Sequence, residues 1–118
     1  ISDRANHTVQ LLKLDGTWIE TLAGFGVPAN TDTWKGLMVV PELMARVTLL
    51  GPDNKVVARL GTDVERVGAD KKRAIRSNEK LWRDGRFVHP HDACFDADGN
   101  IFVAEWVGSG RVTKLTRV

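Results

Sequence analysis

The chain has 118 residues, 42% of them hydrophobic and 27% charged, which is ordinary for a single globular domain. Its 17 lysine and arginine residues against 15 acidic ones give a net charge of only +2, so the mean charge does not favour a nucleic-acid partner. No stretch approaches the roughly 18 consecutive apolar residues of a membrane span, so we expect a soluble protein with no membrane partner. The single cysteine, Cys94, excludes an internal disulfide and is expected to be a buried thiol, so the cellular compartment is left open.

The sequence repeats itself. Val9 falls on Val47 and Leu12 on Leu50 when the first part of the chain is shifted by 38 positions. The matched stretches are 3–22 with 41–60, 28–42 with 90–105, and 46–48 with 111–113. A period of about 40 residues made of short strand-like runs is typical of a β-propeller, whose blades are four-stranded sheets around a central channel.

Ten short runs, bounded by turn residues such as Gly36, Pro41 and Gly61, predict ten strands. In chain order they are 1–3, 8–14, 18–22, 29–33, 37–40, 46–50, 56–60, 91–95, 101–104 and 111–115. Asp98-Gly99-Asn100 is a tight-turn signal between the eighth and ninth runs. The first copy lacks its inner strand and the last copy has no fourth strand, so we predict an all-β fold of roughly three propeller blades, two of them incomplete.

Residues 62–86 interrupt the repeat as an inserted charged loop within a single domain spanning 1–118. The insertion has eight basic and five acidic residues, so it is more basic than the rest of the chain. We expect its apolar side chains to anchor it across one face of the domain: Ala74, Ile75, Leu81 and Trp82. The basic side chains predicted to surround the channel mouth are Lys71, Lys72, Arg73 and Arg76. Either this loop is a lid or an anion-binding surface, or it is a solvated loop held by Trp82.

Two stretches resemble a known repeat family. One is Pro90-x-x-x-x-x-Asp96-x-x-Gly99-Asn-Ile-Phe-Val-Ala-Glu105, followed by Gly110-Arg-Val-Thr-Lys-Leu115. The other is the opening Asp3-Arg-Ala-Asn-His-Thr-Val-Gln10, with its Asn-His dipeptide. These patterns are similar to the NHL repeat over nearly all of the chain outside 62–86. The resemblance implies a six-bladed β-propeller.

The NHL family includes protein-binding modules, RNA-binding modules and a zinc-dependent peptidyl-hydroxyglycine amidating lyase. The resemblance therefore implies either a binding module or a metal-dependent enzyme. The middle copy departs from the family pattern, because Trp34-Lys35-Gly36 replaces the aspartate-glycine turn and 41–44 replaces the Asp-Arg-Ala-Asn stretch. We expect these departures to leave the fold unchanged. A function that family members carry on those loops is not implied for this chain.

The densest group of candidate binding residues is His89-Pro90-His91-Asp92. In a propeller the start of the innermost strand faces the channel, so His89, His91 and Asp92 are predicted at the channel mouth, with Arg86 as an electrostatic clamp. The zinc of the lyase is held by histidines from different blades, one of them in a Pro-His context similar to Pro90-His91. The resemblance thus implies His91 and Asp92 as possible ligands of zinc or calcium.

One chain supplies only one such histidine, because the middle copy has Ala29 and Asn30 at the corresponding positions. A catalytic zinc site usually needs three protein ligands, so Asp92 or His89 and a second copy would have to complete it. The alternative is a hydrogen-bonded channel histidine without a metal.

The residues Asp3, Arg4, Asn6 and His7 are interpreted as a strand-to-strand corner that satisfies local backbone groups. Glu105 occupies the same corner in the last copy, and Trp106 beside it is expected to be an exposed rim aromatic.

An open fan of blades exposes apolar faces at both ends. We therefore predict a homodimer that closes a six-bladed ring; the alternative is that the chain is part of a longer propeller. The favoured function is a propeller scaffold that binds a protein or small-molecule partner. The alternatives are a lyase-like metal enzyme with an axial site and anion or nucleic-acid binding by the basic insertion.

Overall fold

The structure is a computed structural model that describes all of residues 1–118. It is all-β apart from the insertion, and the ten predicted strands are all present. The strands are β1 (Ser2–Asp3), β2 (Thr8–Leu12), β3 (Trp18–Leu22), β4 (Asp32–Trp34), β5 (Leu37–Glu42), β6 (Arg46–Leu50), β7 (Val56–Leu60), β8 (Pro90–Phe95), β9 (Ile101–Glu105) and β10 (Arg111–Leu115). The insertion forms α1 (Val64–Ala69), α2 (Ala74–Ser77) and the 3-10 turn η1 (Glu79–Leu81).

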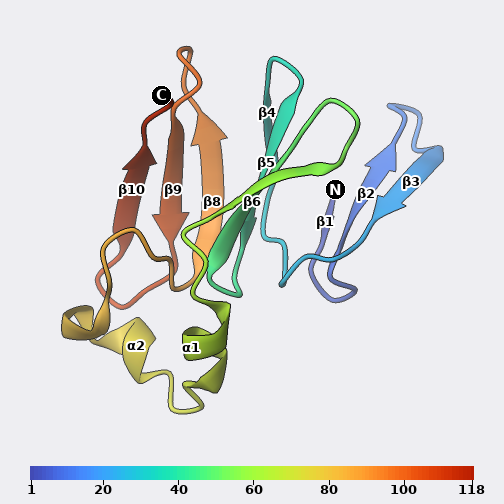
Figure 1. The fold of residues 1–118 in the computed structure, drawn as a ribbon. Helices are drawn as coiled ribbons and strands as arrows, with labels where there is room; N and C mark the ends of the chain where they lie inside the picture. Colours follow the sequence, from blue (N-terminus) through green and yellow to red (C-terminus); the bar gives the residue numbers. More distant parts are fainter.

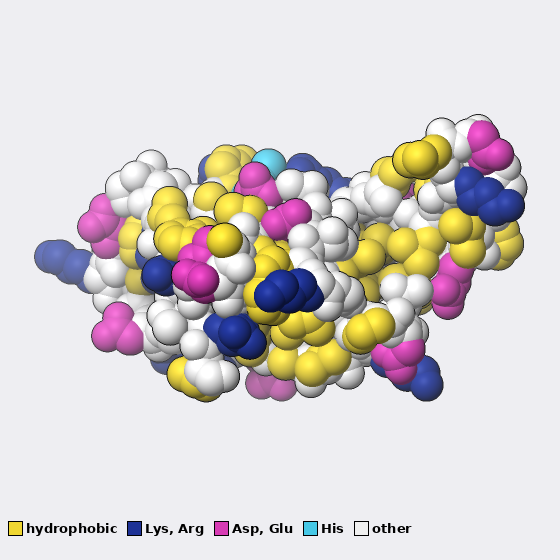
Figure 2. All heavy atoms as spheres, turned by 90° about the horizontal axis from the view of Figure 1, so that it is seen from above, with side chains coloured by type: hydrophobic (Ala, Val, Ile, Leu, Met, Phe, Trp, Pro, Cys, Tyr) yellow, Lys and Arg dark blue, Asp and Glu magenta, His cyan; other side chains and the backbone are white.

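The strands form three antiparallel sheets, which we name sheet A (β1–β2–β3), sheet B (β4–β5–β6–β7) and sheet C (β8–β9–β10). The sheets stand side by side in chain order, with sheet B in the middle, and they do not close into a ring (Figure 1). The molecule measures 45 × 32 × 21 Å, and Figure 2 shows this elongated outline with sheet A as its narrower right-hand end.

Several predicted strand boundaries differ from the structure; the strand predicted at 37–40, for example, continues to Glu42, and two further differences have a local cause. The strand predicted at 29–33 begins only at Asp32, because Pro28 pairs with Glu42 through an isolated bridge before the regular ladder starts. The strand predicted at 8–14 ends at Leu12, where a register shift against β3 interrupts the pairing.

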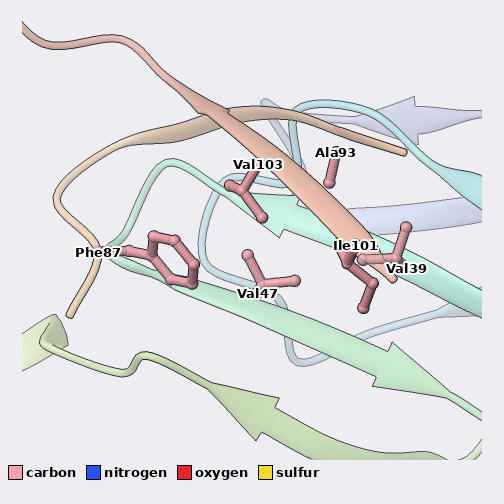
Figure 3. Packing of buried hydrophobic residues seen from close by; sticks show 6 residues of the cluster. All are labelled: Val39, Val47, Phe87, Ala93, Ile101 and Val103. Atoms are coloured by element: carbon pink, nitrogen blue, oxygen red, sulfur yellow. The ribbon is translucent and has the colours of Figure 1, made fainter. Parts of the chain in front are cut away.

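The two central strands of sheet B, β5 and β6, are buried on both faces, and they are largely apolar on successive residues rather than alternately. Val40 and Leu50 pack against Val9 and Leu22 of sheet A. The next residue on β5, Val39, points the other way because side chains alternate across a strand, and it packs against sheet C. Figure 3 shows this second cluster between sheets B and C, formed by Val39, Val47, Phe87, Ala93, Ile101 and Val103.

The insertion is helical rather than a loop, and it lies below the ends of sheets B and C (Figure 1). Val67 of α1 and Ile75 of α2 pack against Ala45, Val88 and Val107 of the sheet connections. Trp82 packs against the same cluster and donates its indole N–H to the Ile75 carbonyl at 2.8 Å. The predicted anchors Ile75 and Trp82 are therefore confirmed, whereas Ala74 and Leu81 are exposed, because the short helices present only one face to the sheets.

Two buried glutamates join neighbouring strands at equivalent corners of sheets B and C. The Glu42 carboxylate accepts hydrogen bonds from the Gly26 N–H, the Thr48 hydroxyl and the Arg46 guanidinium. The Glu105 carboxylate accepts from the Val88 and His89 N–H groups and from the Arg111 guanidinium. Glu105 therefore has the structural role expected for it.

The first corner of the chain is also structural in its local contacts. The Asp3 carboxylate accepts hydrogen bonds from the backbone and side-chain N–H groups of Asn6, the latter at 2.8 Å. His7 Nδ1 accepts from the Val27 N–H at 3.2 Å, which ties this corner to the connection between sheets A and B.

Cys94 is exposed, so the prediction of a buried thiol is wrong. The alternation of β8 turns Ala93 toward sheet B and places Cys94 on the outer face of sheet C. On that face it borders a shallow depression together with Phe102, Ala104 and Val112.

The turn between β8 and β9 is held by one carboxylate, as the Asp98-Gly99-Asn100 signal suggests. Asp96 accepts hydrogen bonds from the Asn100 side chain at 2.7 Å and from the N–H groups of Asn100 and Asp98. These donors, the Asn100 side chain above all, hold the pKa of the Asp96 carboxyl below its ordinary value.

No helix of the structure combines the length and the apolar character needed to cross a membrane.

Candidate functional site

His91 and Asp92 lie where the first strands of the three sheets approach one another. His91 Nε2 is 3.2 Å from an Arg4 guanidinium nitrogen, and the same nitrogen donates to the Ala29 carbonyl at 3.4 Å. Asp92 accepts a hydrogen bond from the Asn30 side chain at 2.6 Å. Side chains of β8 therefore meet side chains of the β1–β2 turn and of the segment before β4 on this edge.

This edge offers two potential metal-binding groups from one chain, His91 and Asp92. Nowhere in the structure do three histidine, cysteine or acidic side chains gather closely enough to hold a metal ion. The Arg4 guanidinium contacts the His91 ring nitrogen and would repel a metal ion there. This edge is therefore better suited to a ligand that accepts hydrogen bonds than to a metal ion.

His89 is two residues away along the chain but belongs to a different site, a cavity of about 260 Å³ between the insertion and the ends of sheets B and C. Its Nδ1 hydrogen-bonds the Leu43 carbonyl at 2.7 Å. Since a carbonyl only accepts, Nδ1 carries the hydrogen, and Nε2 of the neutral ring is left as an acceptor. No side chain or backbone group of the protein pairs with this Nε2.

Arg76 and Trp106 line the same cavity, and the Trp106 ring lies beside His89, with 6.4 Å between the two ring centres. The guanidinium carbon of Arg76 lies 3.5 Å from the centre of a Trp106 ring, and Arg76 Nε donates to the Trp106 carbonyl at 3.2 Å. The Arg76 carbonyl in turn accepts from the Gly108 N–H at 2.9 Å, which fixes α2 against the β9–β10 connection. The arginine is thus held in place, while its two terminal nitrogens have no protein partner.

The remaining lining residues of the cavity come from α1, the start of α2 and the β5–β6 turn: Leu43, Met44, Val67, Gly68, Asp70, Arg73 and Ile75. The Asp70 carboxylate accepts the Ile75 N–H at 2.7 Å. Half of the ten lining residues are hydrophobic, so the site combines an apolar floor with a few polar groups.

The predicted site residues therefore separate into three places. Arg73 and Arg76 of the basic loop join His89 in the cavity, whereas Lys72 is exposed and Lys71 donates to the Gly68 carbonyl. Arg86 lies in neither site, because its guanidinium donates to the Thr62 carbonyl at the other end of the insertion.

Sequence reasoning treated Trp106 as a rim aromatic, and its ring is indeed half exposed. Its pairing with Arg76 was not anticipated, because the two residues are 30 positions apart and on different elements. The turn residues Leu43 and Met44 were missed for the same reason. The sequence carries one signal for this turn: in the register of the repeat, the apolar Met44 falls on the polar Asn6.

No model of a known protein family matches this chain, and no curated protein matches it.

Proposed function

We propose that this chain is a propeller-type binding module whose ligand site is the cavity around His89, Arg76 and Trp106. The observation that carries the function is the cavity itself, where an insertion outside the repeat closes over the sheet ends and positions unpaired polar groups beside apolar ones. The repeat supplies the rigid scaffold, and the insertion supplies one wall of the site.

Repeat equivalence supports interpreting the sheets as propeller blades. Val47 is fully buried between sheets B and C, whereas its counterpart Val112 is 71% exposed on the outer face of sheet C. Leu50 is 1% exposed between sheets A and B, whereas its counterpart Leu12 is 36% exposed on sheet A. The outer face of sheet C thus corresponds to the face of sheet B that packs on sheet C. The outer face of sheet A corresponds to the face of sheet B that packs on sheet A. The two end faces therefore have the residues that form the sheet-to-sheet contacts inside the molecule.

We expect a second copy of the chain to cover these faces, sheet C of one copy packing on sheet A of the other, so that six sheets close a ring. Native mass spectrometry should then find a dimer of twice 13.1 kDa. Val112→Asp should convert it to a monomer, because the interface would bury an unpaired carboxylate. The matched change Val57→Asp, at an exposed residue on the outer strand of sheet B, should leave the dimer intact. A well-folded wild-type monomer would contradict the closed ring.

The proposal that the cavity is the ligand site can be tested by filling the cavity with a larger side chain. A Cβ added at Gly68 of α1 would meet only the terminal methyl of Met44, at 4.0 Å, so a leucine side chain can enter the cavity from the helix. Saturation-transfer NMR with a mixture of aromatic acids, amides and amines should detect ligands of the wild-type protein. We expect Gly68→Leu to abolish their signals while the melting temperature stays the same or rises, because a helical glycine costs about 0.5–1 kcal/mol relative to alanine.

Gly68→Ala is the matched control, since it makes the same helix change without filling the cavity. It should retain ligand binding. If the ligands bind Gly68→Leu as well as the wild type, this cavity is not the binding site.

A further inference from the structure

We infer that the ligand of this cavity is a small carboxylate attached to a flat apolar body. This inference rests on the proposed function, which supplies the site, and it adds the chemical class of the ligand. Three observations lead to it: the unpaired donors of Arg76, the charge of the lining, and the apolar floor.

Arg76 presents the donors that a carboxylate requires. Its Nε is occupied by the Trp106 carbonyl, so the two terminal nitrogens remain as a parallel pair of donors. None of the salt bridges of the protein involves Arg76. A planar carboxylate matches this fork with two parallel N–H···O hydrogen bonds. The Trp106 ring covers one face of the guanidinium, which holds the plane of its donors in a fixed orientation.

The charge of the lining favours a single negative charge. Arg73 and Arg76 are cationic, and neither forms an ion pair. Asp70 is the one acidic lining residue, and its carboxylate is engaged by the Ile75 N–H rather than by an arginine. The two arginines and Asp70 together give a net charge of +1, which one carboxylate balances and a doubly charged phosphate would exceed.

The rest of the ligand is predicted from the floor of the cavity. Val67 and Ile75 are buried residues of the cluster beneath the insertion, and Leu43 and Met44 complete the apolar side. These side chains offer no hydrogen bonds, so they favour a compact hydrocarbon group such as an aromatic ring. His89 Nε2 is the remaining acceptor, and it can receive an O–H or N–H carried by that group.

Benzoate, benzamide and phenyl phosphate are probes that share one ring and differ in charge. Titrations followed by two-dimensional ¹H–¹⁵N NMR should show benzoate perturbing the amides of Leu43, Gly68, Arg76 and His89. We expect benzoate to bind at least tenfold more tightly than benzamide and more tightly than phenyl phosphate. Arg76→Ala should lower the benzoate affinity to that of benzamide and leave benzamide binding unchanged.

Lys80→Ala removes the same charge from the insertion outside the cavity and should leave all three affinities as they are. Thermal melts show whether Arg76→Ala remains folded. Arg76→Lys, which keeps the charge but loses the planar fork, should have intermediate benzoate affinity.

If benzamide or phenyl phosphate binds the cavity as tightly as benzoate, the carboxylate inference is wrong and the cavity remains the binding site. If none of the probes perturbs the cavity amides, both the inference and the proposed function are wrong.

Discussion

Replacing Glu105 with alanine is expected to lower the free energy of unfolding by about 3–5 kcal/mol, the cost of removing one partner of a buried ion pair. The Glu105 side chain is fully buried, and its two oxygens accept hydrogen bonds from Arg111 and from the N–H groups of Val88 and His89. Alanine would leave all of these donors without an acceptor in a region that excludes water. Urea denaturation followed by circular dichroism measures the change.

The same substitution at Glu20 is the control, because this glutamate is exposed and its contact to the Asn54 side chain is long, at 3.5 Å. We expect Glu20→Ala to change the stability by less than about 0.5 kcal/mol. Equal losses for the two variants would mean that the Glu105 corner contributes nothing specific. A second effect is expected only at Glu105: because His89 is attached to that corner through its N–H, Glu105→Ala should also weaken benzoate binding in the cavity under conditions where the variant is folded.

Phe87→Ala is expected to cost about 3–5 kcal/mol, the range for truncating a buried aromatic residue. Phe87 is 3% exposed in the cluster between sheets B and C, and its N–H donates to the Gly61 carbonyl at 2.9 Å (Figure 3). The ring lies so close to Gly61 that a Cβ there would be 2.4 Å from a Phe87 ring carbon. Truncation would therefore leave a cavity at the point where the insertion returns to the sheets.

Phe102 provides the matched change on the outer face of sheet C, where its ring is only half-buried. Phe102→Ala should cost less than about 1 kcal/mol in the monomer, because little apolar surface is returned to water. Denaturation at a protein concentration low enough to dissociate any dimer separates this effect from loss of association. A Phe87→Ala loss no larger than that of Phe102→Ala would show that the cluster between the sheets is not what holds them together.

The strands could be predicted because the pattern of apolar and polar residues along a strand reflects which of its faces are buried. In β5 and β6, apolar residues stand on both faces of each strand, as is typical of a sheet covered on both sides, and the structure places sheet B between two others. Cys94 could not be placed by the same reasoning. An apolar residue in an alternating strand predicts burial only if its face of the sheet is covered, and the outer face of sheet C has no neighbour in the chain.

The candidate site was predicted in its parts but not in its assembly. His89, Arg73 and Arg76 were all recognised as candidates, yet the sequence grouped His89 with His91 because they are neighbours in the chain. The register of β8 shifts between Pro90 and Asp92, so His91 lies at the edge shared with Arg4, while His89 precedes the strand and hydrogen-bonds Leu43. No periodicity in the sequence indicates the stacking of Arg76 on Trp106 or the hydrogen bond between His89 and Leu43, since each joins residues on separate elements.

The sequence by itself thus determined the ten strands, the repeat and the boundaries of the insertion, because hydrophobic alternation and turn chemistry act between residues close in the chain. Only the tertiary structure decided which faces are covered, that the insertion is helical and folds beneath sheets B and C, and that His89 and Arg76 share one cavity. These depend on contacts between distant residues, whose formation is set by the packing of whole sheets rather than by any local preference of the chain.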